Sequence, residues 1–212
     1  IRLPSDKSLY ITSVLRHKKG DSITVIDGIG NVYEALISEI KKGQVSIDIL
    51  KKLSIESESL LKLILCQAIL KGEKMDIVIQ KATELGVKEI IPMVTERCVI
   101  KETRKTKRWR KIAEESAEQC GRIFIPTIHE PVDFPSLLRS HKSFKGFIFW
   151  EEGGKPLKDA VIRAGLKDLE IISSPIYLFI GPEGGLTYEE IKMAQEKGLI
   201  RTTLGKRILR AE

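Results

Sequence analysis

The chain of 212 residues has little of what disulfide frameworks and metal centres require. Its cysteines are odd in number and lack metal-like or paired spacing, so we expect reduced thiols and a cytoplasmic protein. Its histidines are dispersed without a HExxH motif, and no metal site is expected. These residues are Cys66, Cys98, Cys120, His17, His129 and His141.

Long apolar runs and the common catalytic signatures are also missing. No apolar run approaches the roughly 18 residues of a membrane span, and no signal peptide is visible. The chain has no P-loop, no GxGxxG motif and no GxSxG elbow, which argues against those nucleotide-binding and hydrolase classes.

The composition instead indicates a folded, basic protein. Hydrophobic residues make up 42% and charged residues 31% of the chain, enough for a substantial core. A formal net charge of +7 and a pI near 9.2 favour a polyanionic partner. The alternative at this point is a basic protein without such a partner.

Residues 1–57 are expected to be an all-β domain. Three short, partly alternating runs at 22–26, 32–37 and 44–49 are separated by glycine-containing turns. Short strands at this spacing predict a small barrel. A polar stretch at 54–59 is the predicted linker, so the second domain would span residues 58–212.

From about residue 60, strand and helix patterns alternate. Apolar runs predict strands at 61–65, 90–94, 147–150, 177–180 and 200–203, with Pro92 indicating an irregular or edge position. Helical spacing predicts helices at 73–85 and 109–120, and a capping box at Thr187 opens a third helix that ends near Gly198. On the second helix Trp109 and Cys120 are expected to face the core. The order predicts a mostly parallel sheet covered on both faces.

Two glycine turns follow two of these strands. Residues 181–185 read Gly-Pro-Glu-Gly-Gly, and Gly205 follows the strand at 200–203. Ligands of parallel sheets bind beyond the carboxyl ends of strands, where glycine lets the backbone approach them. Glu183 would repel a phosphate, so a neutral or zwitterionic ligand fits better. Each turn taken alone is equally consistent with an ordinary surface turn.

A basic segment lies between residues 97 and 111, with Trp109 among its charges. Such a cluster neutralises phosphates by releasing counterions, and arginine stacks on unpaired bases. The alternative is a solvated loop that leads into an amphipathic helix. The short stretch at 71–74 is either a cationic helix entrance or simply solvated.

Several segments, in this order, resemble one family. They are the stretches 71–75, 80–87, 95–98, 118–122, 180–186 and 204–212, with 14–16 and 19–21 in the first domain. Together they closely resemble the RsmE family, SPOUT-class methyltransferases that modify N3 of a uridine in 16S ribosomal RNA. In that family the chain continues on both sides of this sequence, with a Thr-Ala and a final helix after Glu212.

The resemblance implies a PUA-like β-barrel followed by an α/β SPOUT domain with a deep trefoil knot, acting as a homodimer on the small ribosomal subunit. It places S-adenosylmethionine between the glycine turns, with residues 149–152 at the rim. The cofactor-binding residues it implies are Gly181, Glu183, Gly184, Gly185, Leu204, Gly205, Ile208 and Leu209.

The expected methyl transfer needs a cation near the uracil oxygens, where negative charge develops. Arg210 is the first catalytic candidate, Arg97 and Arg122 are the second, and Glu212 is a speculative base. The predicted RNA-binding residues are Arg16, Lys101, Arg104, Lys105, Lys107 and Arg108. Two alternatives stay open: an RNA-binding protein without catalysis, and a SPOUT methyltransferase that acts on another RNA.

Overall fold

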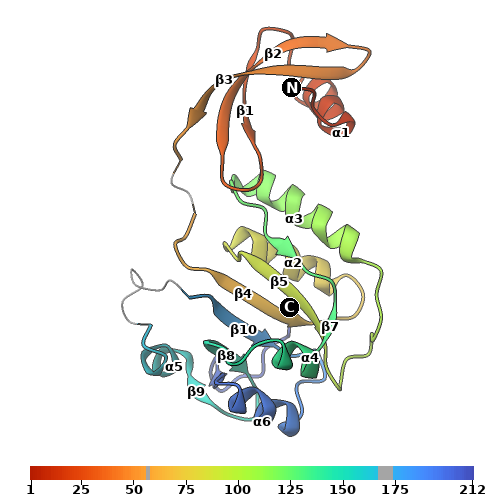
Figure 1. Cartoon of the computed structure of the whole chain (residues 1–212). Coiled ribbons are helices and arrows are strands. Elements are labelled where there is room, and N and C mark those ends of the chain that lie inside the picture. The colour runs from red at the N-terminus through yellow and green to blue at the C-terminus, as the bar shows by residue number, and fades with distance from the viewer. Residues whose placement is uncertain (56–57, 167–173) are drawn as a thin grey trace. The chain divides into compact units, whose positions relative to one another are not determined.

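The computed structural model describes residues 1–55, 58–166 and 174–212 (Figure 1). The chain divides into two compact units, Ile1–Ser57 and Glu58–Glu212. Two residues of the predicted linker, 56 and 57, lie outside the described residues. No helix in the described ranges is long and apolar enough to cross a membrane.

The first unit is built on a three-stranded antiparallel sheet. Its strands β1 (Ser22–Ile26), β2 (Val32–Lys41) and β3 (Gln44–Leu53) are paired in the order β1-β2-β3. Lys42 and Gly43 both have positive φ, 50° and 76°, between the paired Lys41 and Gln44. This is the two-residue turn geometry that suits the twist of a hairpin. The three strands predicted at 22–26, 32–37 and 44–49 are confirmed, and the second and third extend further, to Lys41 and Leu53.

The prediction that residues 1–57 are all-β is wrong at the start of the chain. Helix α1 (Ser5–Leu9) continues into a π-helical turn, η1 (Tyr10–Val14). Ile11 packs in the same core as Ala35 and Val45, and the buried Ser8 hydroxyl accepts a hydrogen bond from Val45 N at 3.1 Å. The β-branched residues here disfavour a helix locally, so burial against the sheet overrides propensity.

The second unit contains a parallel sheet, as predicted. Its described strands are β4 (Leu63–Ala68), β5 (Glu89–Val94), β6 (Thr127–Ile128), β7 (Val132–Asp133), β8 (Gly146–Phe149), β9 (Lys155–Pro156), β10 (Ile176–Ile180) and β11 (Ile200–Thr203). The order is β6-β5-β4-β10-β8-β11-β9, with β7 also pairing β5. All strand pairs among the described residues of this sheet are parallel, so the carboxyl ends of neighbouring strands lie at one edge.

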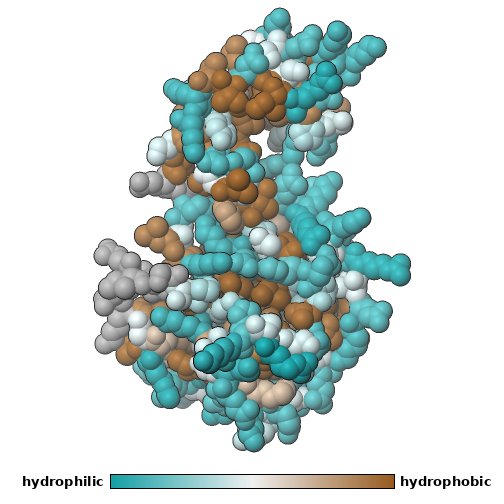
Figure 2. Space-filling model, in the orientation of Figure 1, coloured by the Kyte–Doolittle hydropathy of each residue, from teal (hydrophilic) through white to brown (hydrophobic). Residues whose placement is uncertain are grey.

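Helices cover both faces of this sheet, as Figure 1 shows. They are α2 (Lys74–Glu84), α3 (Thr106–Cys120), α4 (Phe134–Arg139), α5 (Leu157–Arg163) and α6 (Tyr188–Glu196). Because strand side chains alternate, Ile64 joins the core beneath α4 and α6, whereas Leu65 joins the core beneath α2 and α3. On the visible side of the molecule, hydrophobic residues show only in patches between hydrophilic ones (Figure 2).

Pro92 occupies an irregular point of an interior strand. Strand β5 pairs β4 along its whole length, whereas its other side pairs β6 at Glu89 and Ile90 and β7 at Met93 and Val94. Pro92 therefore falls where no partner on that second side needs an N–H. The sequence correctly indicated irregularity, although the strand does not lie at the edge of the sheet.

The predicted helix ends are confirmed to within about one residue, except that α3 begins at Thr106 and not at residue 109. The Thr187 hydroxyl accepts from Glu190 N while the Glu190 carboxylate accepts from Thr187 N, which forms the capping box of α6. Trp109 is buried in the core of the α2–α3 face, as expected. Cys120 is not: it lies in the last turn of α3 with its thiol exposed, because the helix face turns toward solvent there.

Candidate functional site

A cavity of about 890 Å³ opens at the carboxyl ends of three neighbouring strands, β10, β8 and β11. Its wall is made by the residues that follow each strand rather than by the strands alone. They include Trp150 and Glu151 after β8, residues 181–186 after β10 apart from Gly184, and residues 204–212 after β11 apart from Lys206. The sequence correctly placed two glycine turns at two strand ends; the structure adds that the ends meet at one cavity.

The first turn brings its backbone into the cavity wall. Gly185 has φ of 70°, and its N–H donates to the Pro182 carbonyl at 2.9 Å. A Cβ at this position would collide with the Glu151 carboxylate. Glycine is favoured here for the left-handed conformation, since the exposed Glu151 side chain could move away from a Cβ.

Gln67 supports the same turn from the neighbouring strand β4. Its side chain is fully buried, and Nε2 donates to the Ala68 carbonyl at 3.1 Å and to the Gly181 carbonyl at 3.4 Å. Sequence reasoning missed this residue. The available signal was a single amide in the otherwise apolar run of β4, since a buried amide needs partners.

Glu183 ties the turn to the start of α2. Its Oε1 accepts from Lys71 N at 3.0 Å and lies 3.5 Å from Lys74 Nζ. Partial burial acts to raise the pKa of Glu183, but backbone hydrogen bonds and the Lys74 charge outweigh it and lower the pKa. The carboxylate therefore stays ionised, and the stretch at 71–74 is a cationic helix entrance.

The second turn supplies apolar surface. Gly205 has φ of 130°, and its N–H donates to Thr203 Oγ1 at 3.2 Å. Beyond it, Ile208 is 82% exposed and Leu209 is 58% exposed, although both line the cavity. Exposed aliphatic side chains in a concave wall offer apolar contact to a ligand.

Charges of both signs line the cavity. Its cations are Lys74, Arg207 and Arg210, and its anions are Glu151, Glu183 and Glu212. Lys74 Nζ lies 3.3 Å from Glu212 Oε2, and Arg210 Nη1 lies 3.8 Å from Glu212 Oε1. A wall with balanced charge suits a zwitterion better than a phosphate, in agreement with the sequence prediction.

The three predicted catalytic arginines fall in different places. Arg210 lines the cavity, and its side chain is 85% exposed, so it is free to meet a substrate. Arg97 lies behind the first turn, where Nη1 donates to the Gly184 carbonyl at 3.1 Å. Gly184 itself does not line the cavity, since a Cβ there would point at Arg97.

Arg122 belongs to a buried ionic cluster away from the cavity. Its Nη1 donates to the carbonyls of Thr83 and Val87 at 2.8 and 2.9 Å, and Nη2 lies 2.9 Å from Glu58 Oε2. Glu58 also pairs with Lys88. Burial acts to raise the pKa of Glu58, but Arg122 and Lys88 outweigh it and lower the pKa. The structure gives Arg122 a supporting contact in the fold, not a place in the cavity.

Several cations of the basic segment at 97–111 are held by contacts within the chain. Lys101 Nζ donates to the Thr95 and Glu96 carbonyls, Lys105 Nζ donates to the Gly72 carbonyl, and Arg108 pairs with Asp76 at 2.8 Å. Arg104 and Lys107 are exposed, and Arg16 is exposed in the first unit. Within the second unit, Lys101, Lys105 and Arg108 are therefore held by contacts inside the chain, whereas Arg104 and Lys107 are exposed.

Comparison with known proteins covers nearly the whole chain. A family described as RNA methyltransferase domain matches residues 57–212, and one described as RNA methyltransferase PUA domain matches residues 3–50. Ribosomal RNA small subunit methyltransferase E of Bacillus subtilis is 32% identical over 96% of this chain and 81% of that protein. The Synechocystis protein of the same name is 33% identical over 95% of this chain, which spans only 65% of that relative.

Solved structures of similar proteins agree with these sequence matches. Ribosomal RNA small subunit methyltransferase E from Neisseria gonorrhoeae, bound to S-adenosyl methionine, matches with a TM-score of 0.87 at 32% identity. The match covers all of this chain and 85% of that one. A Legionella pneumophila protein in complex with the same cofactor matches with a TM-score of 0.86 at 34% identity, over all of this chain and 86% of its own.

Proposed function

The chain belongs to the RNA methyltransferase family, and we propose that it transfers a methyl group from S-adenosylmethionine to N3 of a uridine in 16S ribosomal RNA. It combines a small PUA-like domain with a parallel-sheet α/β unit of the SPOUT methyltransferase fold. The observation that carries the proposal is the cavity between the two glycine turns, at the position where parallel sheets bind ligands. The trefoil knot implied by the resemblance stays a prediction.

The lining of the cavity fits the cofactor. S-adenosylmethionine carries an ammonium, a carboxylate and a sulfonium, and the wall offers both charge signs and exposed aliphatic side chains. Seven of the eight predicted cofactor residues line it, namely Gly181, Glu183, Gly185, Leu204, Gly205, Ile208 and Leu209. Gly184 would act through the turn it shares with them. When bound, the sulfonium supplies an activated methyl group, and the protein supplies position.

Arg210 is proposed to promote the reaction at the uridine. N3 of uracil is a poor nucleophile while it holds its proton, and removing that proton places negative charge on the ring oxygens. A guanidinium at the cavity mouth would stabilise this charge, and Arg210 is exposed there. Arg97 remains the second candidate, behind the first turn. The uridine must be unpaired or flipped out, since N3 is engaged in base pairing.

The remaining parts of the proposal concern assembly. Unit Ile1–Ser57, with Arg16, would contact the RNA together with the exposed Arg104 and Lys107 of the second unit. The resemblance supports a homodimer and a cytoplasmic site of action on the small ribosomal subunit. Sedimentation equilibrium at several protein concentrations tests this assembly. A homodimer should give a mass twice that of one chain.

The proposed activity is tested with small ribosomal subunits that lack this methylation. Incubation with radiolabelled S-adenosylmethionine should label the 16S RNA, and mass spectrometry of the digested RNA should locate the methyl group on N3 of one uridine. RNA binding without incorporation of label would contradict the proposal and favour a non-catalytic RNA-binding protein. Labelling only of another RNA would contradict the assigned substrate.

A further inference from the structure

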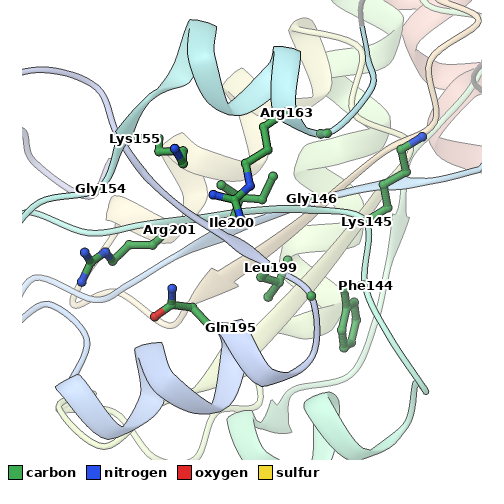
Figure 3. A pocket seen from close by; sticks show the side chains of 12 residues that line it. Phe144, Lys145, Gly146, Gly154, Lys155, Arg163, Gln195, Leu199, Ile200 and Arg201 are labelled. Atoms are coloured by element: carbon green, nitrogen blue, oxygen red, sulfur yellow. The ribbon is translucent and has the colours of Figure 1, made fainter.

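A second cavity, of about 850 Å³, lies at the opposite edge of the same sheet. It is lined at the start of three strands, by Gly146 of β8, Lys155 of β9 and Ile200 of β11. Arg163 and Ala164 at the end of α5 and Gln195 near the end of α6 complete the wall (Figure 3). None of these residues lines the cavity between the glycine turns.

The charge of this cavity has one sign. Lys145, Lys155, Arg163 and Arg201 line it, and no carboxylate among the described residues does. In the described part of the chain, no salt bridge joins any of the four to an acidic side chain. Four like charges held near one another without partners repel, and an anion would relieve that repulsion.

The ends of two helices reduce this positive potential but do not cancel it. Each helix carboxyl end carries about half a negative charge, roughly one unit for both, against four cations. The terminal carbonyls already accept backbone hydrogen bonds, for example Ile162 O from Gly165 N at 3.1 Å and Gln195 O from Gly198 N at 2.9 Å. The basic side chains are therefore not needed to satisfy the helix ends.

The cations are spread along the cavity instead of converging on one point. Figure 3 shows the Arg163 side chain reaching from α5 over Ile200, with Gln195 standing on α6 on the other side. Lys145 and Arg201 extend outward at opposite ends. Arg201 also lies over the Trp150 ring, 5.4 Å from its centroid, which fixes its position. A single phosphate would be met by converging donors, whereas cations spread along a cavity suit an extended polyanion that carries several phosphates.

We propose that this amino-edge cavity binds the phosphodiester backbone of the RNA substrate, at a site separate from the methyl-transfer cavity. The proposal rests on the proposed function for the identity of the substrate. Lys145, Lys155 and Arg163 would contact successive phosphates, with Gln195 as an uncharged donor. The contact would hold a stretch of RNA remote from the target uridine.

The test measures the affinity of the full chain for a 16S RNA transcript at several salt concentrations. In the triple variant Lys145→Gln/Lys155→Gln/Arg163→Gln, affinity should fall at least tenfold. Each lost phosphate contact lowers the slope of log K against log salt by about 0.7, so three contacts predict a change of about 2. A charge-retaining variant, Lys145→Arg/Lys155→Arg/Arg163→Lys, should bind like the unchanged protein.

A matched control removes the same charge elsewhere in the second unit. Lys142, Lys158 and Lys192 are exposed and do not line the cavity, so their combined change to Gln should leave affinity within about threefold. Equal affinity and slope in the two triple variants would overturn the proposal. A second result would also overturn it: the cavity variant binds inorganic phosphate more weakly than the unchanged protein but binds RNA as tightly as the control variant does. The cavity would then be a site for a small phosphorylated compound.

The two proposals fail in different ways. If the proposed function is wrong, the unchanged protein shows no methyl transfer to the RNA, whatever its affinity. If the cavity assignment is wrong, methyl transfer occurs and the triple variant binds RNA like its control. The triple variant should still bind S-adenosylmethionine with unchanged affinity, which also shows that it is folded.

Discussion

The two edges of the parallel sheet carry cavities of similar size, about 890 and about 850 Å³, with different chemistry. At the carboxyl edge, glycine turns, aliphatic side chains and charges of both signs form the wall. At the amino edge, four cations line the cavity, and none of the residues that the structure describes adds a carboxylate to it. One fold therefore presents a site for a zwitterion and a site for a polyanion, and cavity size does not distinguish them.

The difference shows that one cavity is formed mainly by backbone conformation and the other mainly by charged side chains. Gly185 lets the chain approach Glu151 closely, and Gly205 opens the second turn, so the carboxyl-edge cavity depends on conformation. The amino-edge cavity depends on charge carried by flexible side chains such as Lys145 and Arg163. We expect a single substitution to weaken ligand binding at the carboxyl-edge cavity strongly. At the amino-edge cavity, several substitutions should be needed for a comparable loss of binding.

The largest effect is expected at Arg122, which lines neither cavity. Replacing it by Met would leave Glu58 with Lys88 alone and would remove the guanidinium donor from the Val87 carbonyl, whereas Thr83 O would keep its bond from Gly86 N–H. Breaking a buried ion pair costs about 3–5 kcal/mol, so the urea midpoint should fall markedly. Arg104→Met, at an exposed position, should change stability by no more than about 0.5 kcal/mol. A stable Arg122 variant without methyl transfer would instead make Arg122 catalytic.

A change at Arg210 should separate chemistry from binding. Arg210→Ala should lower the rate of methyl transfer by about 10²–10³-fold, the usual loss for one group that stabilises transition-state charge. Affinity for S-adenosylmethionine should be largely kept, because the Arg210 side chain is 85% exposed and the seven predicted cofactor-binding residues of the wall are unchanged; the salt dependence of RNA binding should stay within about twofold. Single-turnover kinetics with Lys206→Ala as control measures this; near-normal turnover of Arg210→Ala would refute its role.

The smallest effect is expected on the free energy of unfolding when the pH is lowered. Burial acts to raise the pKa values of Glu58 and Glu89, but basic partners outweigh it and lower them below the ordinary 4.5. Their stabilisation is complete above about pH 4.5 and is lost as the pH falls through the lowered values. The free energy of unfolding should therefore decrease below pH 4.5, with a shallower slope in Glu58→Gln. An unchanged slope in that variant would contradict the argument.

Local pattern predicted most of the fold. Period-two and helical spacing located the long strands and helices, and the Thr187 capping box fixed the start of α6. The first helix was missed because it is only five residues long and because the β-branched residues of the turn η1 that continues it form a helix only when packed on the sheet. Two-residue strands such as β6 and β9 carry too few residues for any period to show.

The site was predictable only where the signal was local. Glycine turns are visible as adjacent letters, so Gly181 and Gly205 were identified. Arg122 and Arg97 look alike in sequence, yet one donates to buried carbonyls and the other to Gly184. The amino-edge cavity left no local signal, because residues between 145 and 201 meet there only after folding.

Calorimetric titration with S-adenosylmethionine tests the central claim, that the carboxyl-edge cavity is the cofactor site. The unchanged protein should bind one molecule per chain, and Ile208→Asp should weaken binding about tenfold or more, since an aliphatic contact is worth about 1.5–3 kcal/mol. Leu85→Asp, at a position that is also 80% exposed but remote from the cavity, should bind normally. Equal affinity in both variants, or no binding by the unchanged protein, would contradict the claim.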